Sequence, residues 1–187
     1  MKTRKSISVL LSSFLFLLAI AISANVNGQT TLSVLPVNTS AVSSQILNAQ
    51  QWQNVSSMMQ DHFVLQLAGI GTISKLSREH ILLLLKEVPA PDPEGLNEEA
   101  YKIISKKENL HYLLKCSIES IQQVDKSVLA PIRIIIVDGK NGKVYWEKVL
   151  KVNKIVSNPI LSEHILLHEV FKPLINDVSK EIKTLKF

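Results

Sequence analysis

The chain has 187 residues, a formal net charge of +5 and one cysteine. Three of its 21 basic residues and none of its 16 acidic residues lie within residues 1–28, so residues 29–187 carry a charge of about +2. This small excess excludes the strongly basic balance that is typical of nucleic-acid binding. A single cysteine excludes an intramolecular disulfide. Residues 29–187 are enough for one domain with a core and too few for two ordinary domains.

The first 28 residues have the order of a secretory signal peptide. Lys2, Arg4 and Lys5 precede a 14-residue apolar run over 9–22, and small and polar residues follow up to Gly28. A helix needs about 20 apolar residues to cross a bilayer, so the run is short for a membrane anchor. We therefore predict a signal peptide over 1–28 and a mature chain over 29–187; an uncleaved N-terminal anchor is the alternative.

The first half of residues 29–187 alternates strands with helices. Trp52, Val55, Met59, Phe63 and Leu67 are three or four residues apart, so they share one helix face. The patterns predict a strand over 31–37, a helix over 52–67, a strand over 72–76, a helix from Ser77 to about Val88, a proline-rich loop over 89–95 and a helix capped by Asn97 that ends at Lys107. The helix from Ser77 is apolar nearly all round and is expected to be sandwiched.

The second half changes to a period of two residues. Alternation over 110–118, with Leu113 as the exception, predicts a long half-buried strand. The β-branched run over 131–137 is typical of a central strand, and the Asn-Gly pair at 141–142 predicts a hairpin with a strand over 144–152. Tyr145 and Trp146 are consecutive, so we expect them on opposite faces, one in the core and the other available to a partner.

A helical stripe from Leu167 to Leu185 closes the chain, and Pro173 is expected to kink or divide it. The order strand-helix-strand-helix-helix-strand-strand-strand-helix predicts one α/β domain, a mixed β-sheet with packed helices. The predicted core includes Val34, Leu35, Met59, Phe63, Leu84, Leu114, Ile134, Ile136, Trp146, Leu167 and Phe171.

No group of residues forms a catalytic motif in the sequence. His164 and His168 are four residues apart on one helix and are the best metal candidates. The H-E-x-x-H pattern has a Glu directly after its first His, but here Ile165 and Leu166 follow His164, and no third ligand is evident. His111 and Cys116 fall on opposite faces of one strand, so they do not form a nucleophile pair. We therefore assign no catalytic, cofactor-binding or metal residue, and partner-binding residues stay unidentified.

The order of the segments resembles the curli-secretion-channel (CsgG-type) superfamily, which includes the penicillin-binding-protein activator lipoproteins (LpoB-type). The segments that carry the resemblance are LSVLPV at 32–37, FVLQL at 63–67, TISKLSREHILLLLKE at 72–87, LHYLLKCSI at 110–118 and IIIVDGKNGKV at 134–144. The chain departs from the family at Ser77, where Asp is usual, and at Cys116, where Gly is usual. Residues 124–129 are too few for the membrane-spanning hairpins of the channel subunits, so the resemblance does not imply a pore.

The resemblance implies a CsgG/LpoB-like, anticodon-binding-like fold and a non-enzymatic envelope domain that binds another protein. We therefore expect an exported, periplasmic interaction module, either outer-membrane associated or secreted, that serves cell-envelope assembly, secretion or cell-wall synthesis. Its expected partner is an envelope protein or a second copy of the chain, with no nucleic acid, no cofactor, no membrane span after cleavage and no lipid anchor, since Cys116 is the only cysteine. The alternatives are a periplasmic small-ligand carrier and a metal-dependent hydrolase that uses His164 and His168.

Cleavage near Gln29 is the first testable expectation. Mass spectrometry of the protein recovered from cells should show a mature N-terminus at or near this residue, because the apolar run is too short for a stable span. A protein that still begins at Met1 would show that residues 1–28 are an anchor.

Overall fold

The computed structural model describes residues 29–42, 46–86 and 95–187. Its elements are β1 (Thr31–Val34), α2 (Ala49–Leu67), β2 (Thr72–Lys75), α3 (Arg78–Leu84), α4 (Glu98–Glu108), β3 (Tyr112–Ile118), β4 (Gln122–Val124), β5 (Ser127–Asp138), β6 (Val144–Ile155), α5 (Glu163–Ile165), η1 (Leu166–Phe171) and α6 (Lys172–Ile182). The mixed α/β fold with packed helices is confirmed. Most of the predicted loop over 89–95 and all of the predicted signal peptide lie outside the described residues.

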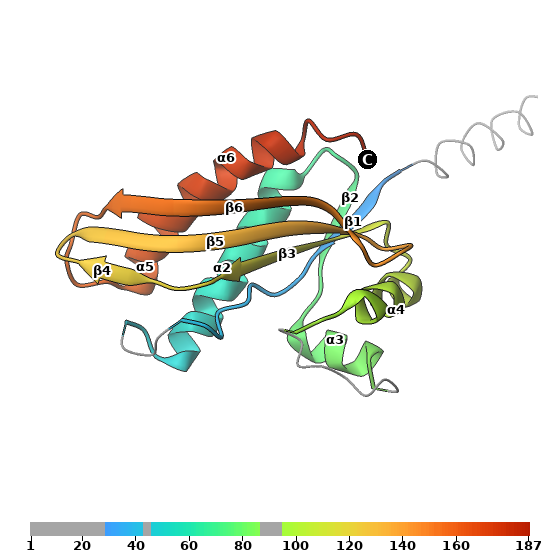
Figure 1. Ribbon diagram of the computed structural model, residues 1–187, viewed down its shortest axis with the longest axis horizontal. Helices are drawn as coiled ribbons and strands as arrows, with labels where there is room; N and C mark the ends of the chain where they lie inside the picture. Colours follow the sequence, from blue (N-terminus) through green and yellow to red (C-terminus); the bar gives the residue numbers. More distant parts are fainter. Residues whose placement is uncertain (1–28, 43–45, 87–94) are drawn as a thin grey trace, which may run out of the picture. The chain divides into compact units, whose positions relative to one another are not determined.

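One six-stranded mixed sheet organises residues 31–187 (Figure 1). β1 is parallel to β2 and β3, whereas β5 is antiparallel to β3, β4 and β6. β6 pairs with β5 along its whole length, so β3 and β4 must share the opposite edge of β5. β5 is therefore the central strand, as predicted, and β6 lies at one edge of the sheet.

Helices cover the two faces of this sheet unequally. The larger core lies on one face, where α2, η1 and α6 pack against alternate residues of β3 and β5 such as Leu114 and Ile134. On the other face, α3 and α4 cover a smaller cluster that includes Leu113 and Val137. The exception at Leu113 in the alternating pattern therefore marks the point where the second face of the sheet is also buried. Figure 1 shows α3 and α4 near one end of the long β5–β6 hairpin and β4 at the other end.

Helix α2 begins and packs as its sequence predicts. Asn48 caps it by accepting from the Gln51 amide at 2.9 Å, and the Gln51 side chain accepts from the Asn48 amide at 2.9 Å. This reciprocal arrangement is a capping box, which satisfies two amides that the first helical turn leaves unpaired. The five residues predicted to share one face of this helix, Trp52, Val55, Met59, Phe63 and Leu67, are all buried.

Three predictions about burial need correction. α3 is not sandwiched: Ile81 and Leu85 are buried, but Leu82 and Leu83 are 47% and 66% exposed, because the helix packs on one side only. Leu84 and Trp146 are half-buried rather than core residues, the second because β6 is an edge strand. The other nine predicted core residues are buried. β4 was not predicted, since three residues are too few to show a period.

The closing helix is not divided at Pro173: helical residues run without a break from Glu163 to Ile182, and Pro173 lies where a π-helical segment changes to α-helix. Residues Leu166–Phe171 form a π-helical segment, and α6 begins at Lys172 with Pro173 in its first turn. The amide of Lys172 bonds the carbonyl of Leu167, five residues back. Proline has no amide to donate, so it interrupts the regular hydrogen bonds of a helix interior, and here it directly follows the turn that bonds five residues back.

The turn between β5 and β6 packs closely against α4. Gly142 has φ +73°, and a Cβ there would lie 2.1 Å from the carbonyl oxygen of Glu98. The Asp138 carboxylate accepts from the Lys140 amide at 2.7 Å, which is the turn interaction expected of an Asp at this position. The turn therefore needs glycine at 142 both for its conformation and for its close approach to α4.

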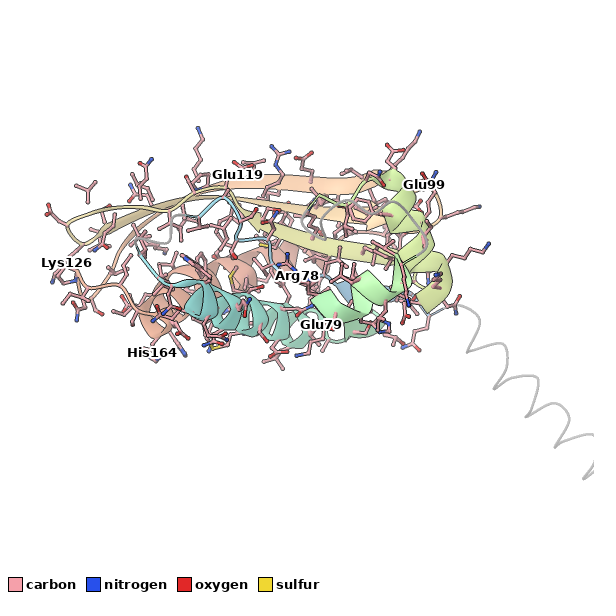
Figure 2. All side chains as sticks on the ribbon, turned by 90° about the horizontal axis from the view of Figure 1, so that it is seen from below. Arg78, Glu79, Glu99, Glu119, Lys126 and His164 are labelled. Atoms are coloured by element: carbon pink, nitrogen blue, oxygen red, sulfur yellow. The ribbon has the colours of Figure 1, made fainter. Side chains whose placement is uncertain are left out.

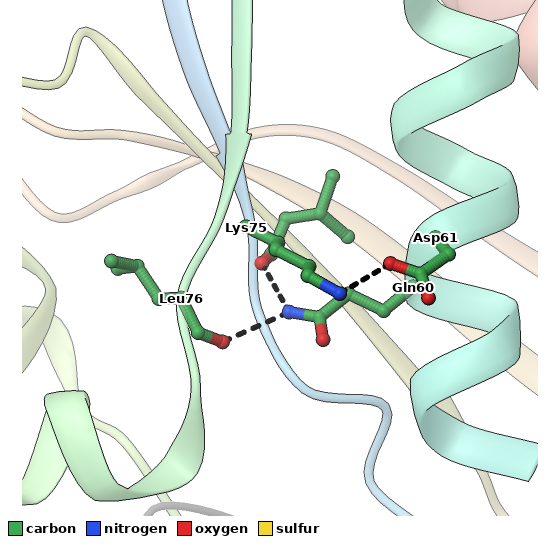
Figure 3. A network of polar contacts seen from close by, with 5 residues as sticks. Gln60, Asp61, Lys75 and Leu76 are labelled. Carbon is green, nitrogen blue, oxygen red and sulfur yellow. Dashed lines mark hydrogen bonds and ion pairs between the residues drawn. The ribbon is translucent and has the colours of Figure 1, made fainter. Parts of the chain in front are cut away.

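A buried glutamine links α2 to the parallel end of the sheet. The Gln60 side-chain amide donates to the carbonyl oxygens of Val34 at 2.7 Å and Leu76 at 2.9 Å (Figure 3). Nearby, an exposed ion pair joins Lys75 to Asp61. Within the described ranges, no helix has the length and apolarity that crossing a membrane requires.

We predict that Gln60→Leu lowers the free energy of unfolding by about 1–3 kcal/mol, because the buried carbonyls lose their donor. Urea denaturation would measure this change. Gln53→Leu is the matched control on the exposed side of α2, with an expected change within about 0.5 kcal/mol. Equal effects of the two substitutions would contradict the structural role of Gln60.

Candidate interaction surface

The sheet has a second face that α3 and α4 leave partly uncovered. We call the uncovered part the open sheet face; its residues are Val124, Leu129, Pro131, Arg133, Glu147, Val149, Lys151, Asn153 and Ile155. Apolar side chains are exposed here: Val124 by 63%, Leu129 by 37%, Val149 by 48% and Ile155 by 81%. An antiparallel sheet commonly has one solvated face, but such a face is ordinarily polar. The open sheet face therefore exposes four apolar side chains to solvent among charged and polar ones.

Charged side chains cross the middle of this surface. Arg133 on β5 donates to Glu119 and to Glu147 on β6, each at 3.0 Å. All three side chains are more than 40% exposed, so the two ion pairs contribute little to stability. Figure 2 shows Lys126 at one end of the sheet and Glu99 of α4 at the other, with Glu119 between them.

Among the described strands, β6 pairs with β5 only, so its other edge is free. The register of the β5–β6 pair shows which backbone groups of β6 lie on this free edge. The Val156 amide donates to the Lys126 carbonyl at 2.9 Å, directly across from it in the β5–β6 register. Hydrogen-bonded and non-hydrogen-bonded pairs alternate in an antiparallel ladder. Counting back from Val156, the backbone groups of residues 148, 150, 152 and 154 point toward β5, and those of 147, 149, 151, 153 and 155 point away from it. Pro131, which has no amide, lies opposite Lys151 and fits this alternation.

A groove runs beside the free edge, between β6 and α6. It has a volume of about 300 Å³, and apolar residues form much of its lining: Leu150, Val152, Pro173, Leu174 and Val178. Lys148, Lys151, Lys154 and Asp177 also line it. Lys148 forms an ion pair with Glu181, and Asp177 forms one with Lys180 at 3.1 Å. Lys151 and Lys154 have no acidic partner among the described residues.

Both ends of β6 are anchored to the helical layer. At its end, Glu169 of η1 accepts from the Ser157 amide at 2.7 Å and from the Ser157 hydroxyl at 2.5 Å. The hydroxyl and then the amide stabilise the carboxylate and lower the pKa of Glu169. At its start, the Tyr145 hydroxyl donates to the Lys186 carbonyl at 2.5 Å.

The predicted placement of Tyr145 and Trp146 on opposite faces is wrong. A bulge at this point makes Tyr145 an extra residue in β6, since Trp146 pairs with Ile136 and Val144 with Val137. The Tyr145 ring lies 5.3 Å from that of Tyr112 and 5.9 Å from that of Phe187, both of which pack against the larger core, as Trp146 does. The Tyr145 ring therefore packs with Tyr112 and Phe187 and is not a separate aromatic side chain available to a partner.

The candidate metal pair gains no further ligand from the fold. The rings of His164 and His168 are stacked with centroids 4.3 Å apart. The described part of the chain contains no group of three or more His, Cys, Asp or Glu side chains placed to hold one ion. Desolvation of the ring, and then the positive charge of Lys172, lower the pKa of His168.

The remaining candidates serve structural contacts. Cys116 is fully buried, and this burial raises the pKa of its thiol to about 12, so it is protonated at neutral pH. His111 interacts instead with Thr31, whose hydroxyl lies 2.8 Å from its Nδ1. His80 of α3 contacts Glu108 of α4 at 2.8 Å and so links the two helices of the smaller cluster.

A polar cavity lies at the end of β1. It has a volume of about 260 Å³, and residues from α2, α3 and β3 line it, among them Ser56, Gln60, Ser77, Arg78 and Lys115. Small-ligand sites are mostly apolar and usually occupy about 300–1,000 Å³. This cavity is smaller and more polar than the pocket that a carrier of apolar ligands needs.

Comparison with known proteins identifies the fold. No protein-family model and no curated protein matches the chain. Among solved structures, the hypothetical protein CT253 from Chlamydia trachomatis is similar, with 12% identity over 83% of this chain and 96% of that one and a TM-score of 0.50. The PelC dodecamer from Paraburkholderia phytofirmans (10% identity, 85% and 90% covered, TM-score 0.47) and the LpoB C-terminal domain from Escherichia coli (17%, 66% and 82%, 0.42) also match. The likeness to CT253 shows a shared fold; the link to the CsgG-type superfamily stays a prediction.

The edge assignment predicts alternating amide exchange along β6. In the free protein, the amides of Lys148, Leu150, Val152 and Lys154 should exchange with solvent about a hundredfold more slowly than those of Val149, Lys151, Asn153 and Ile155, because the first set is bonded to β5. Hydrogen exchange followed by NMR measures each amide. Uniform protection along the strand would mean that a further strand already covers this edge.

Proposed function

We propose that this protein is a non-catalytic, exported envelope protein that works by binding another protein, as an accessory factor in envelope assembly, secretion or cell-wall synthesis. The observation that carries the proposal is the open sheet face together with the free edge of β6. Solvent-exposed apolar residues beside unpaired backbone groups are suited to a protein partner. The signal-peptide pattern of residues 1–28 and the family resemblance over 31–155 support the envelope setting.

The chemistry of the described residues favours binding over catalysis. The Cys116 thiol is protonated and buried, the His111 and His80 side chains engage structural partners, and the His164–His168 pair has no third ligand among the described residues. Catalysis by acid and base groups needs side chains that converge on one substrate position. Exposed apolar surface is instead the common property of Val124, Val149 and Ile155.

Crosslinking in intact cells tests this proposal. A photo-crosslinking residue in place of Val149, on the open sheet face, should capture one defined envelope protein that mass spectrometry identifies. The matched control is the same residue in place of Leu65, an exposed leucine of α2 at 67% exposure, and it should capture much less.

Comparison of crosslinking at Val149 and at Leu65 distinguishes the possible negative results. Capture of a defined protein from Leu65 alone would leave the interaction function standing and move it to the helical side. Capture of no protein from either position, together with a small molecule that copurifies in stoichiometric amount, would contradict the proposal and favour the carrier.

A further inference from the structure

We propose that β6 accepts an extended acidic peptide segment of a partner protein, which adds a strand to the free edge of the sheet. The inference rests on the proposed function and names the partner's chemistry and mode of binding. Addition of a strand to an exposed edge is a general way of recognising extended peptides: backbone hydrogen bonds supply affinity, and pockets for alternate side chains supply selectivity.

The backbone of β6 is ready for such pairing. Residues 147, 149, 151, 153 and 155 direct their amides and carbonyls away from β5, so they can form a ladder with an incoming strand. The hydrogen bonds of Ser157 to Glu169 and of Tyr145 to Lys186 hold the strand at both ends. The edge is therefore extended and fixed before a partner arrives, which reduces the entropy cost of binding.

The side chains on the two sides of this edge define what the peptide should carry. On the helical side, the groove between β6 and α6 offers Leu150, Leu174 and Val178 to apolar side chains. On the open sheet face, Val149 lies next to Lys151 along the same side of the strand. A peptide that alternates apolar and acidic residues can place its apolar side chains over the groove and a carboxylate near Lys151.

Charge selects an acidic peptide over a second copy of this chain. Lys151 and Lys154 lack acidic partners within the described ranges. If two copies paired through β6 in the register that uses all five outward residues, Lys151 would face Lys151 and Lys148 would face Lys154. Like charges directly opposite each other destabilise a strand pair. Lysine on an edge strand also discourages pairing between identical edges.

Titration with two peptides tests the proposal on the mature protein. The first is an eight-residue peptide that alternates glutamate with valine, and the second has lysine in place of glutamate. The glutamate peptide should bind saturably and the lysine peptide should not. On binding, the amides of Val149, Lys151, Asn153 and Ile155 should become protected from hydrogen exchange, which charge attraction alone would not produce.

Matched variants identify the surface. Lys151→Glu with Lys154→Glu should weaken binding of the glutamate peptide about tenfold or more, since residue 151 then repels the carboxylate that faces it and the positive charge on the groove side of the edge is reversed as well. Lys102→Glu with Lys106→Glu, an equal change of charge on exposed residues of α4, should leave binding within about twofold. Val149→Pro should abolish binding while β5–β6 pairing persists, because the lost amide points away from β5.

Five results would overturn the proposal: no binding of the glutamate peptide, equal binding of the two peptides, binding without the alternating protection, equal effects of the two double variants, and dimerisation of the free protein through β6. If the Val149→Pro variant fails to fold, the lysine variants and the pattern of amide exchange still test whether the peptide binds at β6. Since the crosslinking experiment detects a partner at any tested surface, a captured partner together with no peptide binding would overturn the role of β6 alone.

Discussion

Strand β5 is hydrogen-bonded along both of its edges, and both layers of the domain depend on that pairing. β6 occupies one edge, while β3 and β4 share the other. Its residues Ile132, Ile134 and Ile136 are fully buried in the larger core, and Val137 is buried in the smaller cluster on the opposite face. A continuous β-branched run is what a strand buried on this scale requires.

The two helical layers cover the two faces of the sheet to different extents. The long helices cover one face from end to end, but α3 and α4 reach only part of the other, so the outer half of the β5–β6 hairpin is left in water. The residues that stabilise the domain and those of the proposed binding surface are thereby separated in space. Val124, Val149 and Ile155 are exposed and lie outside the larger core.

The sequence predicted those features that local chemistry determines. The spacing of Trp52 to Leu67 defined the buried face of α2, and the Asn97 cap defined the start of α4. Features that depend on contacts between residues far apart in the sequence were not predicted. The exposure of Leu83 depends on how the described elements pack around α3, the placement of Tyr145 depends on a bulge, and the edge position of β6 depends on which strands fill the other side of β5. No pattern within β6 itself shows that none of the described strands pairs with its outer edge, so the candidate surface was not predictable.

The position of β1 also constrains how the chain can fold as it is made. β1 lies between β2 and β3 in parallel pairing, with Val34 opposite Lys75 and Leu114. Synthesis proceeds from the N-terminus, so this apolar strand emerges first but cannot gain its second neighbour until about eighty more residues have been added. The β5–β6 hairpin, by contrast, closes across a short turn. Local pairs form before distant ones, so β1 is the segment most in need of protection while the nascent chain is incomplete.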